Sequence, residues 1–285
     1  MILVADSGTT KTEWCMITDQ GTTETVLTQG INPFYQDAEN ISAILQKEFL
    51  AQKKFDSIFF YGAGCINEEK QNIIKKALLQ VFDTDNIFIG TDLLAAAHSL
   101  CQNQPGVVCI LGTGSNSCYY NGKEIVANVS PLGFILGDEG SGAVLGKKLI
   151  GDVLKKQLSP GIIHDFFTTY PVTPAAILEN VYKKPFPSRY LAGFTKFLSK
   201  NIASVEIQNL VLSGFREFVT RNLLQYPETG RTPIHFTGSI AFHFKEQLRT
   251  VFEEQHLTLG NIEQAPMNGL IKYHNNKTTL KNIQQ

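Results

Sequence analysis

The sequence predicts an α/β protein made of two related lobes, because one strand–turn–strand unit occurs twice. The apolar strand Ile2–Ala5 is followed by the polar turn Asp6–Thr12 and a returning strand. The apolar strand Val107–Leu111 is followed by the glycine- and hydroxyl-rich turn Gly112–Ser117 and a second returning strand. Glycine allows a backbone turn to approach an anion closely. The repetition therefore predicts two related lobes that hold one phosphate chain between them.

The first ninety residues alternate between strands and helices. Ile2–Ala5, Glu13–Thr18 and Thr23–Thr28 predict an antiparallel meander. The apolar periodicity of Asp37–Leu50 predicts an amphipathic helix, and Asn67 is placed to cap a second helix that reaches Val81. The strands Ser57–Tyr61 and Asn86–Ile89 and a helix over Leu93–Leu100 complete the expected order β-β-β-α-β-α-β-α.

The second half repeats the meander and then becomes helical. Asn121-Gly122 is a typical hairpin turn signal after the strand Cys118–Tyr120. A helix is expected from Gly142 to about Gln157, and residues 160–225 are expected to be largely helical. The remaining expected elements are the strand Pro233–Thr237, a helix after it, and a short helix starting at Pro266 before a polar tail. The polar stretch Gln102–Gly106 predicts the boundary between residues 1–105, joined by about 266–285, and residues 106–265.

Composition excludes several classes of partner. The chain has 285 residues with a formal net charge of −1, and no cluster of lysine or arginine indicates a nucleic-acid partner. No apolar run approaches the ~20 residues of a membrane span, and the N-terminus resembles no signal peptide. Five scattered cysteines without a CxxC pair predict reduced core thiols. We therefore expect a cytoplasmic protein with a small-molecule substrate.

Three acidic residues are candidates for chemistry. Asp6, at the end of a strand, is placed to hold Mg²⁺ directly or through water; the alternative is an ordinary polar hairpin. Asp92 follows a strand and precedes a helix, so it is either a base that accepts a proton from an alcohol or a helix N-cap. Asp138 either orients two substrate hydroxyls or caps the helix after Gly142; for Glu139 beside it, capping is the one role considered, and its function is open.

Four motifs carry a resemblance to a known family. They are Asp6–Thr12, Gly112–Asn116, Gly137–Ser141 and Thr237–Ser239. In order and spacing, they resemble the actin/hexokinase/Hsp70 ATPase superfamily and, within it, the BadF/BadG-type ATPase family and its N-acetylglucosamine kinase branch. The resemblance implies two ribonuclease-H-like lobes with a nucleotide and sugar cleft between them. It also implies ATP and Mg²⁺ as cofactors and a homodimer.

The same resemblance assigns roles to individual residues. Asp92 matches the position of the catalytic base, and Asn32, Asn116 and Asp138 match positions that hydrogen-bond an amino sugar. Asp6 is the expected Mg²⁺ ligand. The residues implied to bind the nucleotide are Asp6, Gly8, Thr9, Thr10, Lys11, Thr12, Gly112, Thr113, Gly114, Gly214, Gly238 and Ser239.

Two departures from the family pattern bear on the substrate. Leu132-Gly133-Phe134 stands where related amino-sugar kinases carry Trp-Gly, and the loop Tyr61–Cys65 lacks a serine that some relatives place against the sugar. N-acetylglucosamine phosphorylated at its 6-hydroxyl is the leading expectation, with N-acetylmuramic acid or glucosamine as alternatives. A third alternative is an ATP-gated iron–sulfur electron-transfer activator, but the candidate ligands Cys65, Cys101, Cys109 and Cys118 show no clustered spacing. A non-catalytic sugar sensor is a further alternative, but this sequence shows no DNA-binding domain of the kind that a repressor would add.

Overall fold

A computed structural model describes residues 1–283 except 9–10, 19, 22, 50–53 and 85. The chain forms two compact units. Unit 1 contains Met1–Asn103 together with Pro266–Gln285, and unit 2 contains Gln104–Ala265. No helix in the described part of the chain is long and apolar enough to cross a membrane.

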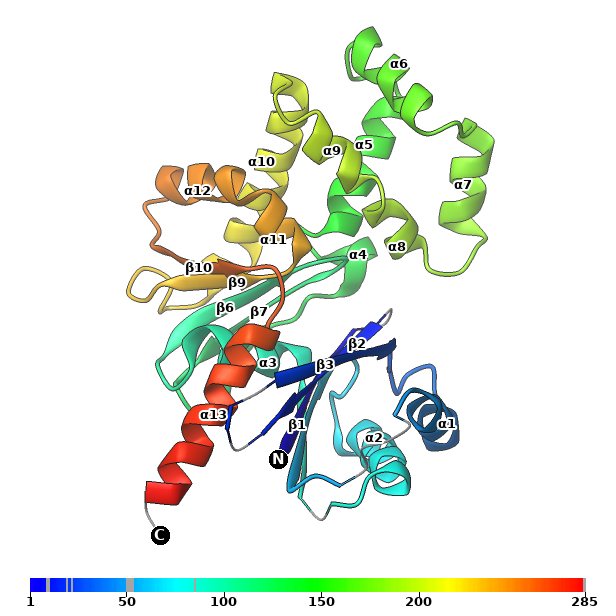
Figure 1. The fold of residues 1–285 in the computed structure, drawn as a ribbon. Helices are drawn as coiled ribbons and strands as arrows, with labels where there is room; N and C mark the ends of the chain where they lie inside the picture. Colours follow the sequence, from blue (N-terminus) through cyan, green and yellow to red (C-terminus); the bar gives the residue numbers. More distant parts are fainter. Residues whose placement is uncertain (9–10, 19, 22, 50–53, 85, 284–285) are drawn as a thin grey trace. The chain divides into compact units, whose positions relative to one another are not determined.

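Unit 1 is a three-layer α/β/α structure (Figure 1). Its strands are β1 (Ile2–Ser7), β2 (Lys11–Ile17), β3 (Thr23–Gln29), β4 (Ser57–Gly62) and β5 (Ile87–Thr91). Its helices are α1 (Ala38–Glu48), α2 (Glu68–Val81), α3 (Asp92–Cys101) and α13 (Met267–Ile283). The strand order is β3-β2-β1-β4-β5, with β2 antiparallel to both β1 and β3, and β4 and β5 parallel to β1.

The alternation of β1 side chains supplies both faces of the unit 1 sheet with core residues. Leu3 and Ala5 pack with the apolar residues of α1 and α2, around the buried Trp14. Val4 points to the opposite face, where Ala95 of α3 and residues of α13 cover the sheet. Because Asp6 has the same parity as Val4, its side chain lies on the face that carries α3.

Unit 2 has a second five-stranded sheet and many more helices. Its strands are β6 (Gly106–Leu111), β7 (Ser115–Tyr120), β8 (Ile125–Val129), β9 (Ile234–Thr237) and β10 (Leu259–Glu263). Its helices are α4 (Gly133–Leu136), α5 (Gly142–Leu154), α6 (Pro160–Thr169), α7 (Pro174–Tyr182), α8 (Pro187–Ala192), α9 (Thr195–Lys200), α10 (Val205–Arg221), η1 (Leu223–Gln225), α11 (Ser239–His243) and α12 (Lys245–Glu254). The strand order is β10-β9-β6-β7-β8.

The core of unit 2 lies between the sheet and its helices. Val107, Cys109 and Leu111 of β6 point to one face, where they join buried residues of α5, α10 and α12. Antiparallel pairing joins β6 to β7 and β7 to β8, while β9 is parallel to both β6 and β10. The glycine-rich turn between β6 and β7 thus lies at the end of a strand that is buried along most of its length.

The structure confirms the α/β class and both meanders, and it corrects the C-terminal element. The expected short helix at Pro266 is α13, which runs to Ile283, because nothing after Gly269 breaks a helix: the following residues are largely polar but include neither glycine nor proline. The strand β10 was not predicted, since its sequence contains Gly260 and Asn261, residues with low strand propensity. Asn67 caps α2 as expected, accepting a hydrogen bond from Lys70 N–H at 3.0 Å.

Candidate functional site

Unit 1 presents two carboxylates at one edge of its sheet. Asp6 is the last but one residue of β1, and Asp92 directly follows β5 as the first residue of α3. Because β1, β4 and β5 run parallel, their carboxyl ends meet at a single edge, the place where open α/β sheets bind ligands. Both acids are partly exposed there.

The charge of Asp92 acts on the Asp6 carboxylate. Burial raises the pKa of Asp6 to about 7, the negative charges of Asp92 and Glu13 add to the rise, and Lys11 opposes it. Burial also raises the pKa of Asp92, against the stabilising hydrogen bond that Leu93 N–H donates to its Oδ1 at 2.9 Å. Repelling carboxylates of this kind form a donor set that a divalent cation fits, because a bound positive charge removes the repulsion.

Asp92 does not cap its helix. The N-cap of α3 is Thr91, whose Oγ1 accepts a hydrogen bond from Leu94 N–H at 3.1 Å. The Thr91 hydroxyl therefore caps the helix, which was the alternative role for Asp92. The carboxylate remains at the first helical position with a raised pKa, which suits a group that accepts a proton.

The turn between β1 and β2 is held together by its own hydroxyls. Ser7 Oγ lies 2.6 Å from Thr12 Oγ1 and donates to Ile31 O at 2.9 Å, and both side chains are buried. The Thr12 hydroxyl thus supports the turn from within and does not face solvent. Gly8 and Lys11 are exposed, and Gly8 N–H donates to Lys11 O at 3.0 Å. Thr9 and Thr10 lie outside the described residues.

Asn32 lies in a buried turn after β3. Its Oδ1 accepts a hydrogen bond from Phe34 N–H at 2.9 Å, and its own N–H donates to Gln36 Oε1 at 2.8 Å. A Cβ at Gly64 would lie 2.6 Å from Asn32 Oδ1, and Gly64 has a φ of +86°, so only glycine fits there. The structure thus brings the Asn32 side chain against the loop that follows β4.

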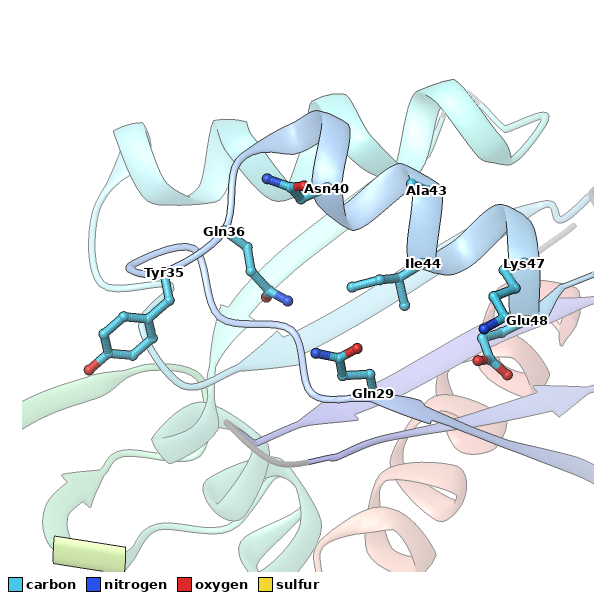
Figure 2. Close-up of a pocket in the computed structure, with 8 residues that line it drawn as sticks. All are labelled: Gln29, Tyr35, Gln36, Asn40, Ala43, Ile44, Lys47 and Glu48. Atoms are coloured by element: carbon cyan, nitrogen blue, oxygen red, sulfur yellow. The ribbon is translucent and has the colours of Figure 1, made fainter. Parts of the chain in front are cut away.

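A groove of about 490 Å³ lies beside the Asn32 turn, between the end of β3 and α1. Figure 2 shows the Gln29 and Gln36 side chains extending into it near Ile44. Gln36 therefore lines the groove and also accepts the hydrogen bond from Asn32 N–H. Gln29 pairs with Lys11 in the sheet, so this end of the groove lies at the same sheet edge as the two acids.

In unit 2, three segments meet at the turn between β6 and β7. Gly142 N–H donates to Gly112 O at 2.8 Å and Ala143 N–H donates to Thr113 O at 3.0 Å, so the first turn of α5 holds the carbonyls of this turn. Gly238 has a φ of +116°, and a Cβ there would lie 2.3 Å from Leu111 O. The sequence-predicted residues Gly112, Thr113, Gly114 and Gly238 are therefore assembled in one place.

Asp138 joins this group. Its Oδ1 accepts a hydrogen bond from Ser115 N–H at 3.3 Å, and a Cβ at Gly114 would lie 3.0 Å from its Oδ2. Burial raises the pKa of Asp138 to about 6, with Glu139 adding to the rise and the Ser115 hydrogen bond and Lys147 opposing it. Asp138 does not cap α5, because Ser141 Oγ accepts from Val144 N–H at 3.2 Å and is the N-cap.

Three other predicted residues lie in different surroundings. Gly214 is buried in the middle of α10, where a Cβ would lie 2.6 Å from Leu145 Cδ2, so its place reflects close packing of α10 on α5. Ser239 is exposed at the start of α11. Asn116 Oδ1 accepts hydrogen bonds from Ser117 N–H and Asn128 Nδ2, each at 2.9 Å. The roles of all three toward a ligand stay predictions.

The cysteines are unsuited to an iron–sulfur cluster. All five are free and buried, as the sequence predicts. Burial raises the pKa of Cys65 and of Cys101 to about 12, with the charge of Asp92 adding to the rise at Cys65, whereas a cluster needs thiolates. Among the described residues, no three His, Cys, Asp or Glu side chains are grouped so that they could hold a metal ion.

Sequence reasoning missed two kinds of residue. Thr91 and Ser141 are helix caps whose signal, a hydroxyl directly before a helical stretch, was present but was overshadowed by the neighbouring acids. Gln36 lies only four residues after Asn32, but it belongs to no motif. The partners of Glu139, Arg221 and Asn222, are more than 80 residues later in the sequence, and only the fold brings them to the acidic loop.

Comparisons with known proteins agree with this fold. Solved structures with the actin-like ATPase fold match the whole chain; one is MreB 5 of Spiroplasma citri bound to AMPPNP, 13% identical, with a TM-score of 0.56 over 99% of this chain and 98% of that one. At that identity the likeness concerns the fold alone. The sequence model of the BadF/BadG/BcrA/BcrD ATPase family matches residues 5–270 of this chain. The chain belongs to this family.

Two relatives are more informative about chemistry. A crystal structure from Porphyromonas gingivalis, provisionally named an N-acetylglucosamine kinase, is 45% identical, with a TM-score of 0.89 over 97% of this chain and 99% of that one. The N-acetylmuramic acid/N-acetylglucosamine kinase of Clostridium acetobutylicum is 28% identical over 145 residues. That match spans 48% of this chain and 46% of the relative, about half of each.

Proposed function

We propose that this protein transfers the γ-phosphoryl group of ATP to an amino sugar, with the 6-hydroxyl of N-acetylglucosamine as the expected acceptor. One observation carries the proposal: Asp92 is not the N-cap of α3, has a raised pKa, and lies with Asp6 at the carboxyl-end edge of the unit 1 sheet. Family membership and the 45% identical relative from P. gingivalis support ATP and an amino sugar as the two substrates.

We propose that Asp92 is the general base. A sugar hydroxyl is a weak nucleophile, so a carboxylate that accepts its proton during attack on the phosphoryl group lowers the barrier. The burial that raises the Asp92 pKa makes its carboxylate a stronger base than an exposed aspartate. At neutral pH, the hydrogen bond from Leu93 N–H favours the charged form that this role requires.

We propose that the two turns act on the phosphates of the same ATP molecule. In unit 1, Gly8, Lys11 and the backbone around Thr9, Thr10 and Thr12 would contribute. In unit 2, Gly112, Thr113 and Gly114 offer a turn whose carbonyls are already bonded to α5. We further propose that Gly214, Gly238 and Ser239 lie toward the adenosine.

We propose Asp6 as the ligand of Mg²⁺. When bound, Mg²⁺ neutralises charge that develops on the transferred phosphoryl group. The pKa of Asp6 is raised by burial and by the charges of Asp92 and Glu13, and this favours a cation there. Asn32, Asn116 and Asp138 are proposed to hydrogen-bond the sugar, whose identity among N-acetylglucosamine, N-acetylmuramic acid and glucosamine is open.

A coupled ADP-release assay over a panel of hexosamines tests the proposal. We expect saturable, sugar-dependent turnover that falls at least ~10²-fold in Asp92→Asn. The exposed Asp165→Asn in α6 is the matched control and should keep wild-type rates. Absence of sugar-dependent ADP release would exclude the kinase, and an active Asp92→Asn would remove this residue as the base.

The alternative electron-transfer function is tested on the same purified protein. An iron-free, colourless preparation is expected, since the cysteine thiols are buried. The buried thiols also support our proposal of a cytoplasmic location. A homodimer is our expectation for the assembly, and light scattering in solution measures it.

A further inference from the structure

Glu139 follows Asp138 in the acidic loop, but its side chain has different partners. Glu139 Oε1 lies 2.5 Å from Arg221 Nε, and Glu139 Oε2 accepts a hydrogen bond from Asn222 Nδ2 at 3.2 Å. Arg221 is the last residue of α10 and Asn222 is its C-cap. Glu139 is 8% exposed. A buried carboxylate thus connects the acidic loop to the end of α10.

The acidic loop, residues 137–141, has a conformationally strained backbone. Asp138 has a φ of +54°, which is uncommon for a residue with a side chain, and Gly140 has a φ of +70°. The turn is closed by Asp138 N–H donating to Pro131 O at 2.8 Å and by Ser141 N–H donating to Asp138 O at 3.1 Å. Strained backbone persists only where the surrounding structure holds it.

The Asp138 carboxylate itself is weakly anchored. The hydrogen bond that it accepts from Ser115 N–H is 3.3 Å long, which is near the upper limit for such a bond. Its position against Gly114 therefore depends on the backbone of residues 137–141. Gly140 rests on α10 at Phe218, where a Cβ would approach the Phe218 Cβ to 3.1 Å, and Glu139 adds the polar contacts to the same helix.

The location of Glu139 is unfavourable for stability alone. The C-terminal end of a helix carries partial negative charge, so a carboxylate there is disfavoured unless a cation compensates. Arg221 supplies that cation while remaining 60% exposed. An ion pair with one buried partner is weak evidence for stabilisation but is well suited to fix a geometry.

We propose that Glu139 is a positioning residue: through Arg221 and Asn222 it holds the strained turn that places the Asp138 carboxylate against Gly114. This inference rests on the proposed function, in which Asp138 hydrogen-bonds the sugar. Its consequence is specific to the acceptor: loss of the Glu139 charge weakens sugar binding and leaves ATP binding and the chemical step largely intact.

Kinetics of Glu139→Gln test the inference, because this variant keeps the shape and an acceptor for Asn222. We expect the KM for the amino sugar to rise about tenfold, with kcat and the KM for ATP within about twofold of wild type. In an Asp138→Asn background, the same substitution should change the sugar KM by less than about twofold, since its effect acts through Asp138.

Arg216→Ala is the matched control. Arg216 also lies in α10, where it forms an ion pair with Glu254 of α12 at 2.8 Å, away from the acidic loop. Its loss should lower the melting temperature and leave the sugar KM unchanged. If Glu139→Gln behaves like Arg216→Ala, or if its effect adds fully to that of Asp138→Asn, Glu139 is merely structural and the inference is wrong.

Hydrogen exchange separates this inference from the proposed function. Amides of residues 137–142 should exchange faster in Glu139→Gln than in wild type or in Arg216→Ala, whether or not the protein has kinase activity. A wild-type protein without sugar-dependent turnover would overturn the proposed function while faster exchange still supports the positioning role. Unchanged exchange in Glu139→Gln would overturn the positioning role itself.

Discussion

The two units share one sheet topology but carry different charges at equivalent positions. The strand order β3-β2-β1-β4-β5 of unit 1 corresponds to β8-β7-β6-β9-β10 of unit 2. In both, an antiparallel meander precedes two parallel strands. Asp6 opposite Glu13 in unit 1 therefore corresponds to Ile110 opposite Asn116 in unit 2, one position before the last pair of each hairpin.

This difference indicates a division of labour within a repeated frame. Acidic residues at the hairpin end of unit 1 favour a cation, whereas the turn of unit 2 has glycine and hydroxyl side chains and no acid. The acid of unit 2, Asp138, comes from a separate loop and lies against Gly114. A repeated fold can thus keep its backbone while the chemistry of each copy is set by a few side chains.

Substitution of Asp138 and of Asp92, the two acids that do not act as helix N-caps, should give the largest kinetic effects. The two substitutions should affect different kinetic constants. In the proposed function, Asp138→Asn removes a charged hydrogen-bond acceptor for two sugar hydroxyls, so we expect the KM for the sugar to rise 10²- to 10³-fold, a loss of up to about 4 kcal/mol. Asp92→Asn should instead lower kcat with little change in KM. Steady-state kinetics with the sugar varied distinguish the two, and a shared kcat defect would refute the separate roles.

Glycines at equivalent positions, Gly62 at the end of β4 and Gly238 directly after β9, should differ in their tolerance of a side chain. A Cβ at Gly238 would meet the backbone oxygen of Leu111 at 2.3 Å, and the φ of +116° adds strain. A Cβ at Gly62 would meet side-chain atoms of Phe60 and Cys65, at 2.7 and 3.3 Å. We expect Gly238→Ala to cost about 3 kcal/mol and Gly62→Ala about 1–2 kcal/mol.

Thermal or denaturant unfolding of both variants measures this difference. Gly151→Ala in α5 is a control, because a Cβ there meets nothing within 4 Å and alanine favours the helix. It should match or exceed wild-type stability. Equal losses at Gly62 and Gly238 would show that backbone contact is not what restricts the second site.

The duplicated meander was predictable because it depends on local signals. Alternating apolar residues, glycine-rich turns and the Asn121-Gly122 hairpin each act over a few residues. The strand β10 pairs only with β9 and contains residues of low strand propensity, so its existence depends on the tertiary frame. The α13 helix was underestimated because a polar segment was interpreted as a tail.

The candidate site was predictable in its motifs but not in its supports. The strand-end position of Asp92 was visible in sequence, whereas the choice between base and cap was not, because Thr91 and Asp92 are both capable of capping. Similarly, nothing in the sequence links Glu139 to Arg221, 82 residues later, or Asn32 to the Gly64 loop. Such contacts follow from helix placement and sheet register.

The acidic character of the unit 1 hairpin should appear as a pH-dependent stability. The pKa of Asp6 is raised from its ordinary 3.8 to about 7, so the folded protein holds a proton that the unfolded chain has released. The free energy of unfolding therefore falls as pH rises from about 4 through about 7. For a partly exposed group we expect a fall of roughly 2 kcal/mol, about half the full linkage value.

Unfolding of Asp6→Asn at pH 5 and pH 8 checks this sign. The variant should lose less stability than wild type between the two values. Glu13→Gln removes one of the charges that raise the Asp6 pKa and should give a smaller change in the same direction. A wild-type protein that is equally stable at both values, or a variant with the same pH dependence, would contradict the electrostatic interpretation of this hairpin.

A substitution in the Asn32 turn should have the smallest effect on the sugar KM. It tests whether unit 1 contributes to binding of the sugar. Gln36→Ala removes the acceptor of Asn32 N–H, so a net loss of about 1 kcal/mol predicts a roughly fivefold rise in the sugar KM. Asn40→Ala is the matched control, because the Asn40 side chain lines the same groove. The N-cap hydrogen bond of α1 runs from the backbone N–H of Asn40 to Asp37 Oδ1, so it does not need the Asn40 side chain. Steady-state kinetics on both variants decide the matter: an equal rise in both would assign the effect to the groove, and no rise in Gln36→Ala would leave acceptor recognition to unit 2.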